Sequence, residues 1–249
     1  MKILCFILCS FLCLNSLVFA ADDDVEKQPL FVGITTFTPP FVLQGANNKA
    51  YGFDVDMMNS LCERMNRVCV FRVMRFDELI PAVRNNTLDA AVSAITITAD
   101  RTKTVNFSLP YLLSYSRFLA KKSEQTTPFK LSQLNDKTIG IVSGTIFADQ
   151  IKHMEIKNPS IVEYSKTEDL LEALSAGKID YVLLDSPTTL YWESTSNGAL
   201  MQVGPPYLFG YGLGIAASAK ELSEINKALL QFQNSPDFKT NYNKYIMQF

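Results

Sequence analysis

An arginine that could bind an anion follows the end of one predicted strand. In the stretch SAITITADR, residues 93–101, the letters AAVSAI that run into it are apolar or small and predict a buried strand, which gives way to Thr96 and Thr98. A guanidinium five residues beyond Thr96 could hold a carboxylate through two parallel hydrogen bonds, a geometry that lysine cannot match. The alternative for Arg101 is a surface ion pair with its neighbour Asp100 or with another acid.

Two other predicted strands end in groups suited to the same small ligand. The run IGIVSGT, residues 139–145, predicts a strand and a turn before a helix, so the backbone N–H groups of Thr145 and Ile146 could donate to an anion. The run YVLLD ends at Asp185, whose carboxylate could neutralise a cation, or could instead cap a helix that starts at Pro187. Because ligands of open α/β sheets collect at the carboxyl ends of strands, we expect one shared site.

Together these groups match the two charges of a free α-amino acid. Arg101, with the backbone N–H groups of Thr96 and Ile146, would bind the carboxylate. Asp185, with the carbonyl of Ala94, would bind the ammonium group. Burying either protein charge alone is costly, whereas two lobes that close over a zwitterion would satisfy all four charges, so closure would be coupled to binding.

Composition and leader exclude several other classes of function. Residues 1–20 are predominantly apolar, carry Lys2 as their one charged side chain and end in a small-x-small motif, which predicts a cleaved signal peptide and an exported chain. Beyond the leader, 22 basic and 25 acidic side chains remain without a basic run, so we expect no nucleic-acid partner. One histidine, His153, and one cysteine pair cannot build a standard zinc site, and the P-loop spacing is absent, so we expect no metal and no cofactor.

Helices and strands alternate in an order that predicts an α/β fold. LFVGITTF predicts a strand, and a helix with apolar residues from Val55 to Met65 follows, with Asp54 as its N-cap. Cys62 lies on this helix and Cys69 opens the next strand. In an exported chain this pair is most simply a disulfide that closes a small loop.

Two segments of the chain have the same pattern of helix, polar turn, aspartate and buried strand. They are ELIPAVRNNTLDAAVSAIT, residues 78–96, and DLLEALSAGKIDYVLLDSP, residues 169–187. In this register Ala94 corresponds to Asp185, at the carboxyl end of each strand. The match predicts two lobes built from similar αβ units; the alternative is that any two helix–turn–strand units look alike.

Six motifs in order resemble those of the polar amino-acid-binding proteins of bacterial ABC transporters, which have the type II periplasmic binding fold. The motifs are PPF…YGFDVDMM, FDELIPAV, SAITITADR…VNFSLPY, IGIVSGT, IDYVLLD and FGYGLGIA. The resemblance implies two α/β lobes joined by two crossover strands that form a hinge, with the ligand between them. Lobe 1 would comprise about residues 30–115 plus 205–249, and lobe 2 about residues 116–204.

The resemblance also implies roles for individual residues. It implies that Arg101 binds the α-carboxylate, with Thr96 beside it, and that Thr145 and Ile146 add hydrogen-bond donors from the second lobe. It also implies that Asp185 binds the ammonium group and that Phe76 lines the pocket for the ligand side chain. The predicted ligand-binding residues are Thr35, Phe37, Phe76, Ser93, Ala94, Thr96, Arg101, Thr145, Ile146 and Asp185.

The cysteine pair is similar to one found in the subgroup of this family that binds arginine, lysine, ornithine or histidine. Within that subgroup, the motifs FDELIP and FGYGLGIA resemble those of arginine-binding members. A flat guanidinium could stack on Phe37 or Phe76, although either ring could equally be ordinary core. Where members of the subgroup often carry an acid, this sequence has Thr35. A threonine cannot neutralise a guanidinium, so the charge partner is missing or comes from elsewhere.

The predicted function is therefore that of a monomeric periplasmic binding protein, not an enzyme, that captures arginine or a related amino acid and delivers it to a membrane permease. One alternative is a secreted dehydratase that acts on cyclohexadienyl amino acids or arogenate on the same fold. Another is a sensor module that presents an amino acid to a signalling partner.

Overall fold

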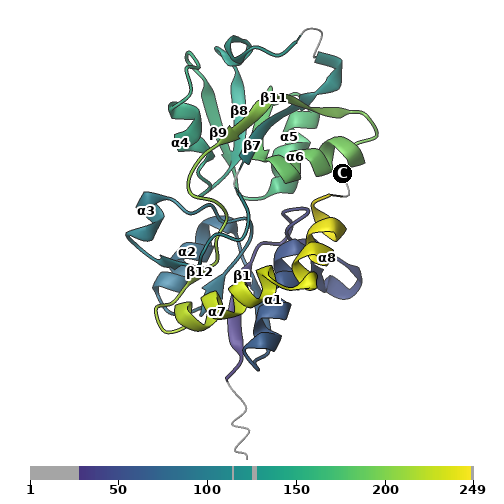
Figure 1. The fold of residues 1–249 in the computed structure, drawn as a ribbon. Helices are drawn as coiled ribbons and strands as arrows, with labels where there is room; N and C mark the ends of the chain where they lie inside the picture. The colour runs from purple at the N-terminus through teal and green to yellow at the C-terminus, as the bar shows by residue number, and fades with distance from the viewer. Residues whose placement is uncertain (1–27, 114, 125–127, 248–249) are drawn as a thin grey trace, which may run out of the picture.

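The computed structural model of the protein describes residues 28–113, 115–124 and 128–247. The predicted signal peptide, residues 1–20, lies outside the described residues. Two five-stranded sheets, each with its own helices, form two lobes that lie one above the other (Figure 1). The predicted arrangement of two α/β lobes is confirmed. Among the described helices, none combines the length and apolar composition needed to cross a bilayer.

The sheet of lobe 1 has the strand order β4–β1–β5–β12–β6. Strand β1 is almost entirely buried and runs parallel to both β4 and β5, whereas β12 is antiparallel to its neighbours β5 and β6. Helices α1, α7 and α8 pack into one apolar cluster with the sheet, and α2 packs into a second one. The strands are β1 (Leu30–Ile34), β4 (Cys69–Val73), β5 (Ala90–Ala91), β6 (Asn106–Phe107) and β12 (Ala216–Ala217). The helices are α1 (Phe53–Arg64), α2 (Phe76–Arg84), α7 (Leu222–Gln233) and α8 (Pro236–Tyr245).

The sheet of lobe 2 has the strand order β11–β7–β10–β8–β9. Strands β8, β9 and β10 are parallel to one another, and β7 is antiparallel to both β10 and β11. A third apolar cluster joins the sheet to its helices. The strands are β7 (Tyr115–Lys121), β8 (Thr138–Val142), β9 (Ser160–Tyr164), β10 (Tyr181–Asp185) and β11 (Leu200–Leu208). The helices are α4 (Phe147–Lys152), α5 (Thr167–Ser175) and α6 (Ser186–Thr195).

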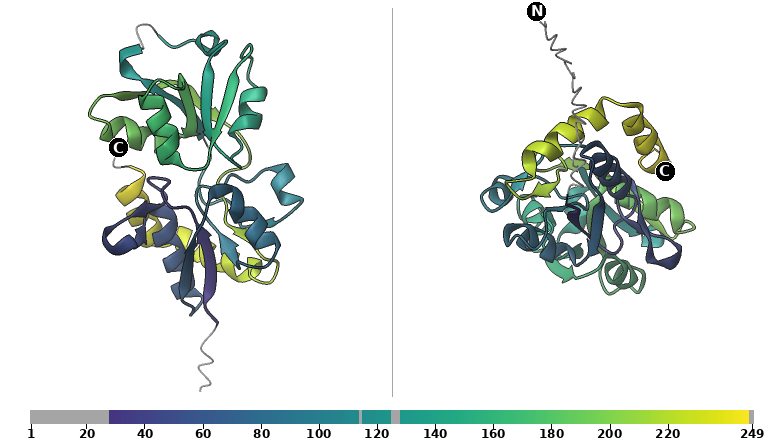
Figure 2. Two further views of the ribbon diagram at one scale, coloured as in Figure 1. Left: turned by 180° about the vertical axis from the view of Figure 1, so that it is seen from behind. Right: turned by 90° about the horizontal axis from the view of Figure 1, so that it is seen from below.

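The chain passes between the lobes twice, after β6 and again after β11, and the view from behind in Figure 2 shows both passages. The two connecting segments are hydrogen-bonded to each other: the N–H of Leu213 donates to the carbonyl of Leu112, and the N–H of Tyr111 donates to the carbonyl of Leu213. The remaining elements are short, namely β2 (Leu43–Gln44), β3 (Ala50–Tyr51), α3 (Ala99–Thr102) and the 3₁₀ turns Ala46–Asn48, Lys122–Glu124 and Leu131–Leu134.

Two aspartates occupy equivalent places in the two lobes. Asp89 precedes β5 and accepts a hydrogen bond from the N–H of Phe31 in β1 at 2.9 Å. Asp180 precedes β10 and accepts one from the N–H of Thr138 in β8 at 2.8 Å. Each carboxylate thus holds its own strand beside the neighbouring parallel strand, so the two segments with matching patterns form the same αβ unit.

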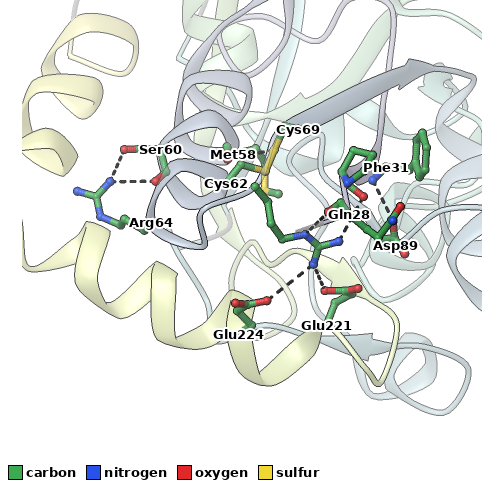
Figure 3. Close-up of a disulfide and its surroundings, with 12 residues drawn as sticks. Gln28, Phe31, Met58, Ser60, Cys62, Arg64, Cys69, Asp89, Glu221 and Glu224 are labelled. Carbon is green, nitrogen blue, oxygen red and sulfur yellow. Dashed lines mark hydrogen bonds and ion pairs between the residues drawn. A yellow bond between two sulfur atoms is a disulfide. The ribbon is translucent and has the colours of Figure 1, made fainter. Parts of the chain in front are cut away.

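The cysteine pair forms the predicted disulfide. It joins α1 to the start of β4, with the Cα atoms of Cys62 and Cys69 5.7 Å apart (Figure 3). Nearby, the buried guanidinium of Arg67 forms ion pairs with Glu221 and Glu224 of the C-terminal part of lobe 1. The disulfide and the ion pairs hold this end of lobe 1 together.

One predicted helix boundary is wrong. Helix α1 begins at Phe53 with Gly52 as its N-cap, so Asp54 lies inside the first turn and does not cap it. The Asp54 side chain is fully buried and accepts hydrogen bonds from the Ala94 N–H and the Tyr111 hydroxyl. Long-range partners for the carboxylate, which local sequence does not reveal, account for the difference.

Candidate functional site

A cavity lies between the lobes and is lined by the loops that follow the carboxyl ends of parallel strands in both sheets. Lobe 1 contributes the loops after β1, β4 and β5, and lobe 2 those after β8, β9 and β10. All the predicted ligand-binding residues line it, namely Thr35, Phe37, Phe76, Ser93, Ala94, Thr96, Arg101, Thr145, Ile146 and Asp185. The expectation of one shared site at the strand ends agrees with this geometry.

Arg101 is held at the cavity by the short helix α3. Thr98 is the N-cap of this helix, and its hydroxyl accepts a hydrogen bond from the Arg101 N–H at 3.2 Å. The guanidinium donates to the Thr96 carbonyl at 2.7 Å and to the Gly144 carbonyl of lobe 2 at 2.8 Å. The alternative partner, Asp100, pairs with Lys103 instead.

The two bonds of the guanidinium leave donor capacity for a ligand. A guanidinium has five N–H groups in a planar fork, and two of them account for the bonds of Arg101 to Thr96 and Gly144. Both acceptors are neutral carbonyls, so neither cancels the positive charge of Arg101. The ring of Phe76 lies 5.7 Å from its central carbon and adds a cation–π contact.

Arg101 and Asp185 bring opposite charges into the same enclosed space. Burial lowers the pKa of Arg101 to about 10, although the Asp185 carboxylate acts in the other direction. Burial raises the pKa of Asp185 to about 7, opposed by a bond to its own backbone N–H and by Arg101. Each shift reflects the cost of keeping a charge away from water, and a ligand with both charges would offset that cost.

Asp185 ends β10 at the N-cap position of α6, but its carboxylate forms no side-chain cap bond there. The carboxylate is therefore not committed to the helix. One turn further on, Thr188 also lines the cavity and is 1 % exposed. Its hydroxyl has no hydrogen-bond partner among the described residues. The sequence reasoning missed Thr188, although its i+3 spacing from Asp185 on a helix could have revealed it.

Ala94 adopts a backbone conformation that needs support from outside its own loop. Its φ is +50°, an uncommon value for a residue other than glycine. The Ala94 N–H donates to the Asp54 carboxylate at 2.7 Å, and the same oxygen accepts from the Tyr111 hydroxyl at 3.1 Å. Burial raises the pKa of Asp54 to about 7. Asp54 and Tyr111 thus fix the loop from behind the cavity wall.

Neutral hydroxyl groups occupy the end of β1. The N–H of Thr35 donates to the Ser93 hydroxyl at 2.9 Å. The Thr35 hydroxyl shares hydrogen bonds with the hydroxyls of Thr38 at 2.8 Å and Ser93 at 3.0 Å. This network fixes the first and third loops of lobe 1 relative to each other and contributes no charge.

The turn after β8 brings the backbone of lobe 2 to the cavity. The Thr145 hydroxyl donates to the Val142 carbonyl at 2.6 Å, so its proton is directed to its own strand. Ile146 is the N-cap of α4. Gly144 has a φ of +77°, and a Cβ atom there would lie 2.7 Å from the Cα of Asp77 in lobe 1. Only glycine allows this approach of the two lobes without strain.

Aromatic side chains line the cavity and connect the lobes. Phe37 contacts Tyr191 and Trp192 of α6 edge-on, with ring centroids 6.4 and 6.0 Å apart. Phe76 packs against the apolar clusters of both lobes. Both rings therefore have structural contacts besides any contact with a ligand.

The polar groups of the cavity suit a small organic ion. No group of three or more His, Cys, Asp or Glu side chains that could hold a metal ion occurs in the described part of the chain. The charged groups that line the cavity are of both signs, namely Arg75, Arg101, Lys166, Glu168 and Asp185.

Comparisons with known proteins agree with this geometry. Residues 30–248 match the model of the bacterial extracellular solute-binding proteins, family 3. The ABC transporter arginine-binding protein 1 of Escherichia coli (strain K12) is 35% identical over 208 residues, which cover 82% of this chain and 81% of that protein. The arginine-binding periplasmic protein of Mannheimia haemolytica is 29% identical over 94% of this chain and 97% of its own length.

A solved structure has the same fold. The arginine 3rd transport system periplasmic binding protein from Legionella pneumophila superposes with a TM-score of 0.82 at 30% identity, over 88% of this chain and 100% of that one. The predicted two-lobed type II periplasmic-binding-protein fold is thereby confirmed. From the family match and these relatives, the chain belongs to the bacterial extracellular solute-binding proteins, family 3.

Proposed function

We propose that this protein is a periplasmic binding protein that captures arginine, or the related lysine, ornithine or histidine, and delivers it to an ABC-transporter permease. The observation that carries the proposal is that Arg101 of lobe 1 and Asp185 of lobe 2 line one cavity. The relatives described as arginine-binding proteins support the choice of ligand.

In this proposal the ligand brings an opposite charge to each of the two buried charges, Arg101 and Asp185. Its carboxylate accepts hydrogen bonds from the remaining N–H groups of Arg101 and from the N–H of Ile146 at the start of α4. Its ammonium group binds the Asp185 carboxylate and the carbonyl of Ala94. The Thr188 hydroxyl, which is buried and unpartnered among the described residues, gains an ammonium N–H as its partner. Each charge of the zwitterion meets an opposite charge, so binding compensates for the burial that shifts both pKa values.

Binding would also hold the two lobes together. The bond from Arg101 to Gly144 and the aromatic contacts of Phe37 with α6 already join lobe 1 to lobe 2. A ligand that contacts both lobes adds to these bonds only in the closed arrangement. It therefore shifts the population of the protein towards closure by its differential affinity for that arrangement.

The remaining assignments form part of the same proposal. The chain is exported to the periplasm with cleavage near Ala20 and Ala21, acts as a monomer and catalyses no reaction. Its lobes comprise residues 30–115 plus 205–249 and residues 116–204. The strand composition of the two sheets supports this division to within a few residues, since the sheet of lobe 2 runs from Tyr115 in β7 to Leu208 in β11. Relatives described as periplasmic binding proteins support the location. These relatives do not favour the dehydratase alternative.

Calorimetry of the purified protein, stripped of ligand, against the twenty amino acids and ornithine tests the proposal. We expect arginine to bind with a 1:1 stoichiometry, and the Arg101→Ala variant to lose this binding. Arg84→Ala is the matched control, because Arg84 is exposed at the end of α2 and away from the cavity. If no amino acid binds more tightly than about 100 μM, roughly −5.5 kcal/mol, the proposal is wrong.

A further inference from the structure

A basic ligand needs a negative charge near the end of its side chain, and lobe 1 does not supply it at β1. The hydroxyl of Thr35 is bonded to Thr38 and Ser93 and has no charge to offer. The acidic residues that line the cavity are Asp185 and Glu168. In the proposed function Asp185 serves the ammonium group, which leaves Glu168.

Glu168 and Asp185 line the cavity near the ends of two different strands of lobe 2. Glu168 belongs to the first turn of α5, directly after β9, whereas Asp185 ends β10. Strand β8 separates the two, because the sheet order is β10–β8–β9. Two strand spacings correspond to about 10 Å. An extended arginine spans about 7 Å from its ammonium nitrogen to the carbon of its guanidinium, from standard bond lengths. A ligand anchored at Asp185 therefore reaches towards Glu168 when its side chain runs across the ends of the strands.

The charged side chains considered together with Glu168 favour the binding of a cation. Arg75 and Lys166 also line the cavity. The Arg75 guanidinium donates to both carboxylate oxygens of Asp77 at 3.0 Å and lies 3.6 Å from the Glu78 carboxylate. Its charge is thus opposed by two acids. With Lys166 and Glu168 included, these five side chains sum to one negative charge at neutral pH.

The residues of lobe 1 that line the cavity after β4 suit the apolar part of a basic side chain. Met74 and Phe76 follow β4 and line the cavity from lobe 1. The thioether and the ring provide an apolar surface for methylene groups, and the ring face attracts a guanidinium or ammonium group. In addition, Glu168 lies in the first turn of a nine-residue helix, where acidic side chains are favourable.

We propose that the Glu168 carboxylate binds the side-chain cation of the ligand and determines the preference of the site for basic over neutral amino acids. This inference rests on the proposed function. It assigns to lobe 2 the charge that Thr35 cannot supply from lobe 1.

The test compares arginine with citrulline, which has the same shape but a neutral ureido group. For the Glu168→Gln variant, we expect the Kd of arginine by calorimetry to rise about three- to tenfold. The Kd of citrulline is expected to change less than twofold, because it has no charge to lose a partner. Asp169→Asn is the matched control: Asp169 is the next residue on the same helical turn and is also exposed, but it does not line the cavity.

Each outcome separates this inference from the proposed function. If Glu168→Gln weakens arginine and citrulline equally, or if Asp169→Asn reproduces its effect, the inference is wrong while arginine binding stands. If the unaltered protein binds none of arginine, lysine, ornithine and histidine, the proposed function itself fails. A Lys166→Gln variant that binds arginine more tightly and citrulline unchanged supports the inference, since it removes the opposing charge beside Glu168.

Discussion

The guanidinium of Arg101 in lobe 1 donates a hydrogen bond at 2.8 Å to the backbone carbonyl of Gly144 in lobe 2. The bond joins the two lobes at Gly144, which also lies against the backbone of Asp77 in lobe 1. The residue proposed to bind the ligand carboxylate is therefore also a direct link between the lobes. Ligand affinity and lobe closure should respond together to changes at this contact.

A side chain at position 144 should prevent the lobes from approaching. In Gly144→Ala the added Cβ would lie 2.7 Å from the Asp77 Cα, and the φ of +77° disfavours alanine. We expect arginine affinity to fall at least about tenfold, together with a smaller decrease in radius of gyration on addition of ligand. Calorimetry and small-angle scattering measure the two effects.

Gly198→Ala is the control for this change. Gly198 has a φ of +79° but no atom within 4 Å of the position of a Cβ. Both variants should lose about 1 kcal/mol of stability from backbone strain, but only Gly144→Ala should lose affinity. Equal affinities for the two variants would contradict the role of Gly144 in closure.

Replacing the guanidinium by an ammonium group should weaken binding even though the charge is kept. Arg101→Lys loses the planar fork that donates to Thr96, Gly144 and the ligand at the same time. With hydrogen bonds to charged groups worth about 1.5–3 kcal/mol each, we expect arginine affinity to fall by about 10- to 100-fold. Titration calorimetry of this variant beside Arg84→Lys measures the difference; unchanged affinity would disprove the carboxylate role of Arg101.

Replacing Thr188 by valine should affect stability and arginine affinity in different directions. Its buried hydroxyl has no partner among the described residues, so Thr188→Val should keep or raise the melting temperature by removing an unsatisfied group. In contrast, affinity for arginine should fall about tenfold, because the ammonium group loses a hydrogen-bond acceptor. Thermal denaturation and calorimetry report the two quantities separately.

The adjacent Thr189 provides the opposite pattern. Its hydroxyl donates to the Ser186 carbonyl at 2.8 Å, so Thr189→Val should lower the melting temperature and leave affinity nearly unchanged. A Thr188→Val variant that behaved in the same way would show that Thr188 has only a structural role.

Asp54 should make the stability of the protein fall as pH rises. Its pKa is raised from 3.8 to about 7 by burial, so the folded state binds more protons than the unfolded state between these values. Its contribution is fully present below pH 3.8 and is lost as pH rises towards 7. Asp54→Asn keeps an acceptor for Ala94 and Tyr111 but does not ionise. We expect the variant to equal the unaltered protein near pH 4 and to exceed it at pH 7 by on the order of 3 kcal/mol.

Urea denaturation at a series of pH values measures this effect. The unaltered protein is measured in parallel at each pH. A profile that keeps its full slope in Asp54→Asn would show that the pKa of Asp54 is the same in the folded and unfolded states.

The disulfide should contribute stability without affecting the site. Cys62 and Cys69 are seven residues apart, and closing a loop of this length stabilises the fold by about 2–3 kcal/mol in the chain-entropy account. Neither cysteine lines the cavity. The double variant Cys62→Ser, Cys69→Ser should therefore unfold at lower denaturant concentration but bind arginine with unchanged affinity. A large loss of affinity in the folded variant would connect the disulfide to the site.

Much of the cavity could be predicted because its residues follow strands. Buried parallel strands have recognisable apolar runs, and their carboxyl ends meet at one edge of a sheet. Polar or small residues directly after such runs, such as Ser93, Thr145 and Asp185, must therefore lie near one another. All the predicted residues line the cavity for this reason, whereas their roles in binding remain predictions.

Other features depend on partners that are distant in the sequence. Asp54 fitted an N-cap by its position at the start of a helix, but its carboxylate is bonded to Ala94 and Tyr111, 40 and 57 residues away. Glu168 and Thr188 were missed because each resembles an ordinary residue in the first turn of a helix. Only the neighbouring loops of the other strands make them part of a cavity.

The sequence by itself determined the elements, the apolar face of each and the charged groups at the strand ends, because periodicity and residue type report what each segment can bury. Only the tertiary structure decided how one lobe lies on the other. This arrangement brings Gly144 of lobe 2 against both Arg101 and the backbone of Asp77 in lobe 1. The relative position of two lobes depends on a small number of contacts between segments far apart in the chain, and no local pattern specifies those contacts.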